Sequence, residues 1–155
     1  MTTLFLTPGH PFEPDDLVGA RFLNRLANRP DILSAINPTV AALDLTPLAL
    51  SPGTVVVFHD EHNAGLFFPF GPGGKLWEGH YLFASLRGKP ARDFAKQAVR
   101  MAFDRTPALA IVGQVPKEHR AARVMSRAIG CRPLGESVDD LGRACIRYIL
   151  ERGHG

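Results

Sequence analysis

The chain has 155 residues, of which 45% are hydrophobic and 21% charged, a size and balance that exclude disordered and collagen-like chains and favour one globular domain. No stretch approaches the ~18 unbroken apolar residues of a membrane span, and the first residues lack the basic head and apolar run of a signal peptide. We therefore expect a single domain over residues 1–155, in the cytoplasm and without membrane attachment.

The net charge of +3 conceals an asymmetry between the two halves of the chain. Residues 1–86 carry eight acidic and four basic side chains, whereas residues 87–155 carry seven acidic and fourteen basic ones. The second half therefore either meets an anionic partner, such as a phosphorylated cofactor or a nucleic acid, or forms a solvated basic surface. It holds only three aromatic residues that could stack on bases, so a nucleic acid is the less favoured partner.

The first third of the sequence has helical patterns. Two aspartates are typical of a helix start, and apolar residues at near-helical spacing follow them, so we expect a helix over about residues 15–28. The sequence Arg29-Pro30 ends this helix, and one or two further turns are expected over residues 32–36. The stretch over residues 39–52 is apolar but interrupted by prolines, and we expect it to be irregular.

A strand pattern follows. Residues 54–59 and 64–68 are rich in β-branched and aromatic side chains and flank a turn-forming segment, which predicts a hairpin. A third strand is expected over residues 76–85. Side chains alternate between the two faces of a strand. One face of the third strand should therefore carry Trp77, Tyr81 and Phe83, and the other Glu78, His80 and Leu82.

The second half of the chain has the pattern of a crossover unit. Apolar residues between Ala91 and Phe103 fall at helical spacing and predict the clearest helix of the chain. Residues 108–115 then predict a buried strand parallel to the one before the helix. A second helix is expected to begin at Pro116, and a last strand covers residues 144–150. The inward side chains of the second helix are expected to be Ala121, Val124, Met125, Ala128 and Ile129.

Cysteine and histidine usage does not indicate a metal site. Cys131 and Cys145 are too few for a disulfide framework or a four-cysteine zinc site, so we expect them to be small core residues. The run from His59 to His62 holds four side chains of ligand type, but successive residues of a strand or turn point in different directions. An ordinary hairpin turn without a metal is the expected structure.

The order of elements resembles that of the GNAT superfamily of acetyl-CoA-dependent N-acetyltransferases. The residues that carry the resemblance are Arg87-Gly88-Lys89, between a strand and a helix, and the run from Val115 to Cys131. It covers roughly residues 54–150 and is strongest toward small GNAT-like proteins of tailed phages and prophages. It implies an α+β, GNAT-like fold with a mixed, mostly antiparallel sheet flanked by helices. It also implies acetyl-CoA as cosubstrate and an unidentified amine as its acceptor, and it leaves room for a homodimer or a phage or host protein partner.

The resemblance implies a cofactor loop after the third strand. The family loop has the form Arg/Gln-x-x-Gly-x-Gly/Ala, and here Pro90 and Arg92 occupy its two small positions. Because Pro90 lacks an N–H group, either side chains hold the phosphates or the site is degenerate; a purely structural loop is the other reading. The cofactor-binding residues implied in this way are Phe83, Ala84, Ser85, Arg87, Gly88, Lys89, Arg92 and His119.

Glu78 and His80 are the predicted catalytic residues. Two positions apart on a strand, they share a face at a spacing of about 6.6–6.8 Å, and the family commonly places its general base on this strand. A carboxylate or an imidazole can remove a proton from an amine, directly or through one water. The alternative is that His80 is a satisfied core residue and Glu78 is its partner or a surface charge.

The general acid of the family is missing. Family members usually begin the later helix with asparagine and carry a tyrosine seven residues on, where this chain has His119 and Ser126. His119 can replace the acid near neutral pH, or it can be a surface or capping residue. The alternative function is therefore a catalytically inactive GNAT-fold protein with a structural, assembly or partner-binding role. Three arginines on the same helix either reach the 3′-phosphate of coenzyme A or are solvated; they are Arg120, Arg123 and Arg127.

Overall fold

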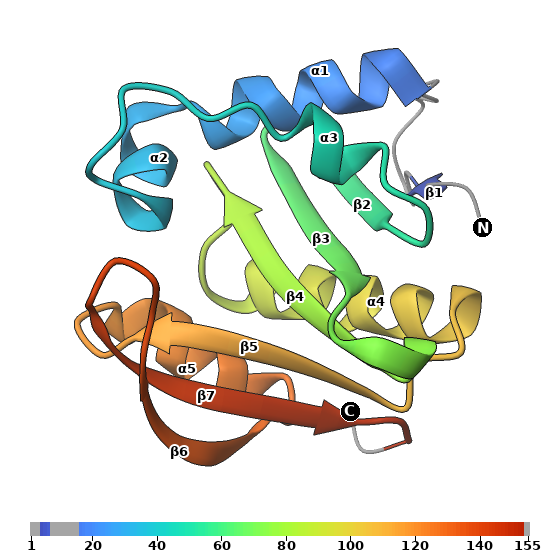
Figure 1. The fold of residues 1–155 in the computed structure, drawn as a ribbon, viewed down its shortest axis with the longest axis vertical. Coiled ribbons are helices and arrows are strands. Elements are labelled where there is room, and N and C mark those ends of the chain that lie inside the picture. Colours follow the sequence, from blue (N-terminus) through green and yellow to red (C-terminus); the bar gives the residue numbers. More distant parts are fainter. Residues whose placement is uncertain (1–3, 7–15, 154–155) are drawn as a thin grey trace.

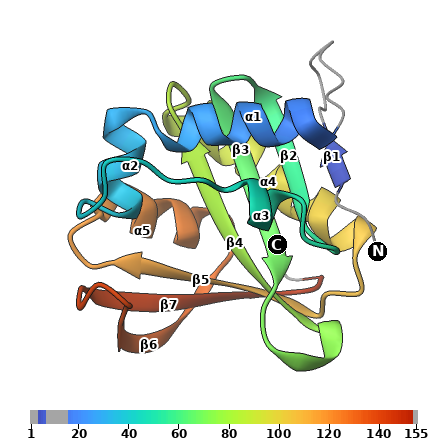
Figure 2. The ribbon, with the colours of Figure 1, turned by 45° about the horizontal axis from the view of Figure 1, so that its top comes forward.

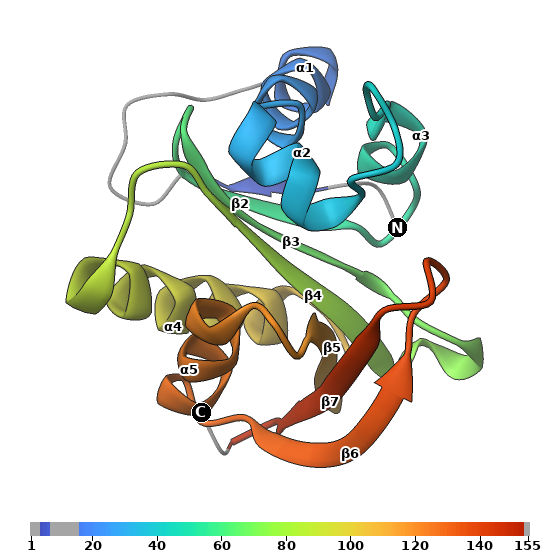
Figure 3. The same ribbon diagram turned by 90° about the vertical axis from the view of Figure 1, so that its left-hand side faces the viewer.

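The computed structural model describes residues 4–6 and 16–153, which contain one seven-stranded mixed sheet in the order β1-β2-β3-β4-β5-β7-β6, with helices on both faces (Figures 1 and 3). The strands are β1 (Leu4–Leu6), β2 (Val55–Asp60), β3 (Asn63–Pro69), β4 (Leu76–Phe83), β5 (Ala110–Pro116), β6 (Arg132–Val138) and β7 (Ala144–Glu151). The helices are α1 (Asp16–Ala27), α2 (Pro30–Ile36), α3 (Thr46–Ala49), α4 (Gly88–Arg105) and α5 (Arg120–Ala128), with a short 3₁₀ turn at Pro72–Gly74. The predicted α+β class is confirmed.

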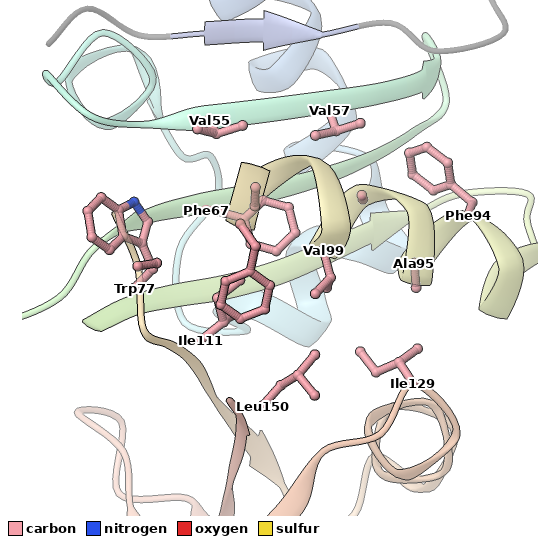
Figure 4. Close-up of a cluster of buried hydrophobic side chains, with 14 residues drawn as sticks. Val55, Val57, Phe67, Trp77, Phe94, Ala95, Val99, Ile111, Ile129 and Leu150 are labelled. Atoms are coloured by element: carbon pink, nitrogen blue, oxygen red, sulfur yellow. The ribbon is translucent and has the colours of Figure 1, made fainter. Parts of the chain in front are cut away.

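Two apolar clusters hold the helices on the sheet. On one face the apolar stripe of α4 packs on β2 and β3, and Phe67 and Trp77 are buried beneath it (Figure 4). On the other face Leu23 and Leu26 of α1 pack against Val56 and its neighbours. Burying a large apolar side chain contributes about 1.5–3 kcal/mol. The sheet between these layers is therefore a firm platform for the residues that β4 presents.

The sheet divides between β4 and β5. These two strands are parallel and pair over only three positions, the last being Glu78 with Val112. Beyond this point β4 stays paired with β3 as far as Phe83, while β5 stays paired with β7 as far as Pro116. The two halves of the sheet therefore diverge after Glu78 (Figures 1 and 2), and the facing edges of β4 and β5 have no strand pairing with each other there.

Some parts of the sequence-based prediction are wrong. The strand β6 was not predicted, because it is an edge strand that is exposed along nearly all its length and lacks a buried face. The short helix α3 falls in the stretch expected to be irregular; Pro47 is tolerated in its first turn, where an N–H group has no helical partner. The prediction for α5 is wrong in its start, because Pro116 is the last residue of β5 and the helix begins at Arg120.

The predicted inward face of α5 is also wrong in part, at its N-terminal end. Val124 is 55% exposed and Ala121 is exposed, whereas Ile129, just past the helix, is buried and Met125 packs beside it. The helix therefore reaches the core only at its C-terminal end. Cys145 is buried as expected, while Cys131 is only partly buried and both thiols are free. No helix among the described residues is long and apolar enough to cross a membrane.

Candidate active site

The two predicted catalytic side chains lie together at the point where the sheet divides. Glu78 is the last residue of β4 that pairs with β5, and His80 follows on the same face. His80 Nε2 lies 3.7 Å from Glu78 Oε2, and the His80 ring stacks on Phe68 with centroids 5.7 Å apart. The side chains are 44% exposed for His80 and 23% for Glu78. His80 is therefore not a core residue, and a substrate can reach both groups.

The face that carries Glu78 continues across β5 and β7 as a polar surface. Register places Gln114 of β5 opposite Arg147 of β7, and Gln114 Nε2 donates a hydrogen bond of 2.8 Å to Ser137 Oγ. Arg147 is exposed. The face of the sheet that carries Glu78 thus has polar side chains on β5 and β7 as well, and the Gln114 amide is already bonded to Ser137.

Arg143 joins the turn between β6 and β7 to the end of α2, a contact that we call the clasp. The Arg143 guanidinium donates hydrogen bonds to the carbonyl oxygens of Ala35 and Ile36 at the end of α2, both at 2.9 Å, and to Asp139 Oδ2 at 2.7 Å. Although burial raises the pKa of Asp139, the hydrogen bonds that this carboxyl accepts from Arg143 and Leu141 outweigh it and lower the pKa below its usual value. The clasp ties the β6–β7 turn to α2, and the sequence gives no local signal for a contact between such distant segments.

The loop between β4 and α4 holds most of the predicted cofactor residues. Arg87 Nη1 donates to the carbonyl oxygens of Phe83 (3.3 Å) and Leu86 (2.8 Å), so this guanidinium stabilises its own loop. Lys89 Nζ pairs with Asp93 at 2.6 Å, and this contact lowers the pKa of the Asp93 carboxyl. The side chain of Lys89 is 77% exposed, and Arg92 is also exposed. The predicted cations are close in sequence, but two of them already have protein partners.

The helix start itself provides anion-binding groups. Gly88, the first residue of α4, has φ +61°, a left-handed conformation that favours glycine. The first N–H groups of a helix have no intrahelical partner, and the N-terminal end of the helix dipole is positive. Pro90 removes one of these donors, and the first turn of α4 contains no acidic residue. The geometry therefore suits a phosphate group with fewer backbone donors than the family pattern.

The backbone of residues 84 to 86 is occupied from within the protein. Ala84 N–H donates to His62 O at 2.9 Å, and the N–H groups of Ser85 and Leu86 donate to the side-chain oxygen of Asn63. Phe83 packs its ring against Phe94 of α4, with centroids 5.8 Å apart. Ala84 and Ser85 thus have a structural role, which sequence reasoning missed because it assigned Asn63 only to a turn.

Two weakly acidic groups line the other face of the divided sheet. Tyr81 and Cys131 both pack against the α4-side core. Burial, with a smaller contribution from Cys131, raises the pKa of Tyr81 well above its usual value. Burial also raises the pKa of the Cys131 thiol to about 11. Both groups therefore stay protonated at neutral pH and can donate a proton or a hydrogen bond.

The residues at the positions of the family's later helix are arranged differently. His119 is the N-cap residue of α5, and its side chain makes no capping hydrogen bond. Ser126 Oγ donates to Ala122 O at 3.0 Å within the helix. Arg120 and Arg127 are exposed. The Nε atom of Arg123 is buried and, among the described residues, is the only buried side-chain nitrogen or oxygen without a hydrogen-bond partner.

The His59–His62 segment forms a hairpin turn. Asp60 Oδ2 binds the Nδ1 atom of His59 at 2.9 Å, and Asp60 Oδ1 accepts the His62 backbone N–H at 2.8 Å. Burial raises the pKa of Asp60, but these hydrogen bonds outweigh it and lower the pKa below its usual value. Across the described parts of the chain, no cluster of three or more ligand-type side chains could hold a metal ion.

Two surface cavities lie away from Glu78 and His80. One has a volume of about 240 Å³ beside the C-terminal half of α4, and the other about 150 Å³ beside the end of α1. The first is lined by Lys96, Val99, Arg100, Phe103, Asp104, Ile129, Arg152 and Gly153, and the second by Arg25, Leu26, Arg29, Glu61 and His62.

No protein-family model matches the sequence, and no curated protein matches it. Solved structures do match the fold. An aminoglycoside acetyltransferase AAC(6′)-Ib in complex with paromomycin and acetyl-CoA has 13% identity and a TM-score of 0.66, over 86% of this chain and 88% of that one. An uncharacterized protein from Bacillus halodurans has 9% identity and a TM-score of 0.65, over 87% and 80%. The fold is that of the GNAT acetyltransferases.

Other GNAT structures match a shorter segment. A spermidine N-acetyltransferase SpeG chimera, from Vibrio cholerae and hSSAT, has 17% identity and a TM-score of 0.51, and the match spans 57% of this chain and 58% of that one. A ribosomal-protein-S5-alanine acetyltransferase from Vibrio fischeri has 13% identity and a TM-score of 0.52, over 59% and 54%. The chain thus spans little more than half the length of these two proteins. The predicted GNAT-like fold is confirmed.

Proposed function

We propose that this protein is an acetyl-CoA-dependent N-acetyltransferase that holds its cosubstrate between β4 and β5 and transfers the acetyl group to an amine. The observation that carries the proposal is the divergence of the two parallel strands after Glu78. Glu78 is the last residue of β4 that pairs with β5, and the unpaired part of β4 leads on to the start of α4. Support comes from the fold neighbours, among which AAC(6′)-Ib was solved with coenzyme A and with acetyl-CoA.

The residues around the diverging strands fit acetyl-CoA. The edge of β4 from Gly79 to Phe83 has no β5 partner, so backbone groups there can bind the pantetheine arm. The N–H groups at the start of α4 suit the pyrophosphate. Lys89 and Arg92 are exposed near the same loop.

The proposed chemistry assigns one role to each face of β4. The bound thioester supplies an activated acetyl group. On the exposed face Glu78 removes the proton from the attacking amine, with His80 beside it as the second candidate base. On the opposite face Tyr81 retains its proton and can give it to the departing sulfur, in place of the tyrosine that Ser126 replaces. Holding both reactants in line supplies much of the rate enhancement.

The first test is isothermal titration of acetyl-CoA into the full chain. We expect micromolar binding, weakened at least about tenfold by the triple change Arg87→Ala, Lys89→Ala, Arg92→Ala. A matched control removes three cations farther along the same helix, by Lys96→Ala, Arg100→Ala and Arg105→Ala. Equal losses in both triple variants would show a nonspecific charge effect. Absence of binding at millimolar acetyl-CoA would refute the proposal.

The second candidate function is binding of a protein partner without catalysis. Ser126 has its hydroxyl bonded back into α5, and β6 exposes Leu134 (49%) and Val138 (67%) at the edge of the sheet. An exposed edge strand that carries two exposed apolar side chains favours association with another chain. The partners to test are a second copy of this chain and a phage or host protein. The two functions are separated by measuring the release of free thiol from acetyl-CoA in the presence of a panel of amines. An acetyltransferase releases thiol, and its Glu78→Gln variant loses this activity, whereas a partner-binding protein releases none.

A further inference from the structure

We propose that Asn63 is a positioning residue for the cosubstrate: its buried side-chain amide fixes the conformation of Ser85 and Leu86, which lead into the start of α4, where the pyrophosphate is proposed to bind. This inference rests on the proposed acetyltransferase function. Asn63 begins β3, and its side chain is fully buried. It lies at the end of the β2–β3 hairpin, next to the loop that follows β4 in the register of the sheet, where Asn63 pairs with Phe83.

Four hydrogen bonds use the whole capacity of the Asn63 amide. The Nδ2 group donates to Asp60 Oδ1 at 2.9 Å and to Ser85 Oγ at 2.8 Å. The Oδ1 atom accepts the backbone N–H of Ser85 at 3.1 Å and that of Leu86 at 3.0 Å. Two backbone donors on one side and a carboxylate on the other fix which amide atom is oxygen and which is nitrogen. The side chain can therefore occupy only one orientation.

The same arrangement determines the shape of the loop. Asn63 binds the N–H groups of Ser85 and Leu86, the two residues directly before Arg87, which is the N-cap of α4. The bonds therefore fix the segment from which α4 begins. Ala84 adds a second anchor through its N–H bond to His62 O. Removal of the amide takes away the side-chain acceptor of two backbone N–H groups, those of Ser85 and Leu86, and the loss of each bond is costly.

No other residue type reproduces these contacts. Aspartate would keep the oxygen that accepts the Ser85 and Leu86 N–H groups but would lose both donors and face the Asp60 carboxylate. The Asp60 carboxylate is itself fixed by bonds from the His59 ring and the His62 backbone. Hydrogen bonds thus connect the β2–β3 turn, through the Asn63 amide, to the cofactor loop.

The test compares Asn63→Ala with Asn28→Ala in the full chain. Asn28 makes three side-chain bonds at 2.7–2.8 Å, two with the backbone of Leu43 and one with the carbonyl oxygen of Asn24 in α1, away from the cofactor loop. Titration calorimetry measures acetyl-CoA binding, and amide hydrogen exchange without ligand measures protection of Ser85 and Leu86. We expect Asn63→Ala to weaken binding about tenfold and to accelerate exchange at both amides, and Asn28→Ala to change neither by more than about twofold.

Normal acetyl-CoA binding by a folded Asn63→Ala variant overturns this inference and leaves the proposed function intact. Absence of binding by the unaltered protein overturns both. Equal weakening by Asn28→Ala also overturns the inference, because the effect would then be one of general stability. Should Asn63→Ala fail to fold, Ser85→Ala removes a single bond to the amide; about threefold weaker binding is expected, and unchanged binding overturns the inference.

Discussion

The division of the sheet can be tested at Gly113, which follows Val112, the last residue of β5 that pairs with β4. Continued pairing would set Gly113 opposite Gly79, which follows the last paired position of β4. A Cβ atom added at Gly113 would lie 3.7 Å from Gly79 O, an ordinary van der Waals contact. We expect Gly113→Ala to change the free energy of unfolding by less than about 1 kcal/mol, because the methyl group fits and alanine also lowers the entropy of the unfolded chain.

Acetyl-CoA binding should respond differently. The added methyl group stands between the diverging strands, beside the β4 backbone that the pantetheine arm is proposed to contact. We expect at least about tenfold weaker binding, equivalent to 1.4 kcal/mol. Gly79→Ala is the contrasting variant, because its Cβ would lie 3.0 Å from Ile111 and 3.1 Å from the Phe67 ring. Such overpacking costs about 1–3 kcal/mol of stability.

Urea denaturation and titration calorimetry on the same preparations separate the two effects. The reasoning requires Gly113→Ala to lose binding while keeping stability, and Gly79→Ala to lose stability. A Gly113→Ala protein that is stable and binds acetyl-CoA normally would refute the placement of the cosubstrate between β4 and β5.

Four further changes have defined outcomes. Glu78→Gln should lower kcat about 10²–10⁴-fold with unchanged acetyl-CoA affinity, and steady-state kinetics that show no loss would exclude it as the base. Tyr81→Phe should lower kcat while denaturation shows a stable fold; unchanged kcat would remove it as the acid. Because the pKa of Asp60 is lowered on folding, its stabilising effect is present above about pH 4 and is lost as pH falls through the folded pKa; Asp60→Asn should flatten that part of the acid-denaturation curve, and an unchanged slope would contradict this. Arg143→Ala should cost about 2 kcal/mol for two lost bonds to α2, against less than about 1 kcal/mol for Arg132→Ala, which breaks an exposed pair; equal losses in urea denaturation would contradict the clasp.

Local periodicity in the sequence predicts the central elements well. The stripe from Ala91 to Phe103 is buried as expected, because a helix against a sheet must place its apolar residues at helical spacing. Alternation along β4 correctly separates Trp77 from Glu78 and His80, which is why the proposed catalytic pair could be named from the sequence. The order of these elements was also sufficient for the GNAT-like fold.

Edges of the structure were predicted less well. The strand β6 has no buried side, so its sequence carries no alternation between apolar and polar residues. The helix α5 has a strongly amphipathic sequence, yet Val124 remains exposed because the helix contacts the core only near Ile129. A hydrophobic pattern predicts a face that can be buried, and the positions of neighbouring elements decide whether it is.

The contacts that shape the proposed site could not be predicted from the sequence at all, because they join residues far apart in the chain. Asn63 binds Ser85 and Leu86, which lie 22 and 23 positions away, and Arg143 binds the carbonyl oxygens of residues 107 and 108 positions away. The hydrophobic periodicity of the sequence does not predict such pairs. Locally, Asn63 has the sequence context of an ordinary turn residue and Arg143 that of a surface cation. Their partners are mostly backbone groups, which every sequence possesses. The functional proposal therefore rests on the strand divergence, and the three-dimensional structure was needed to show which buried polar groups hold the loops around it.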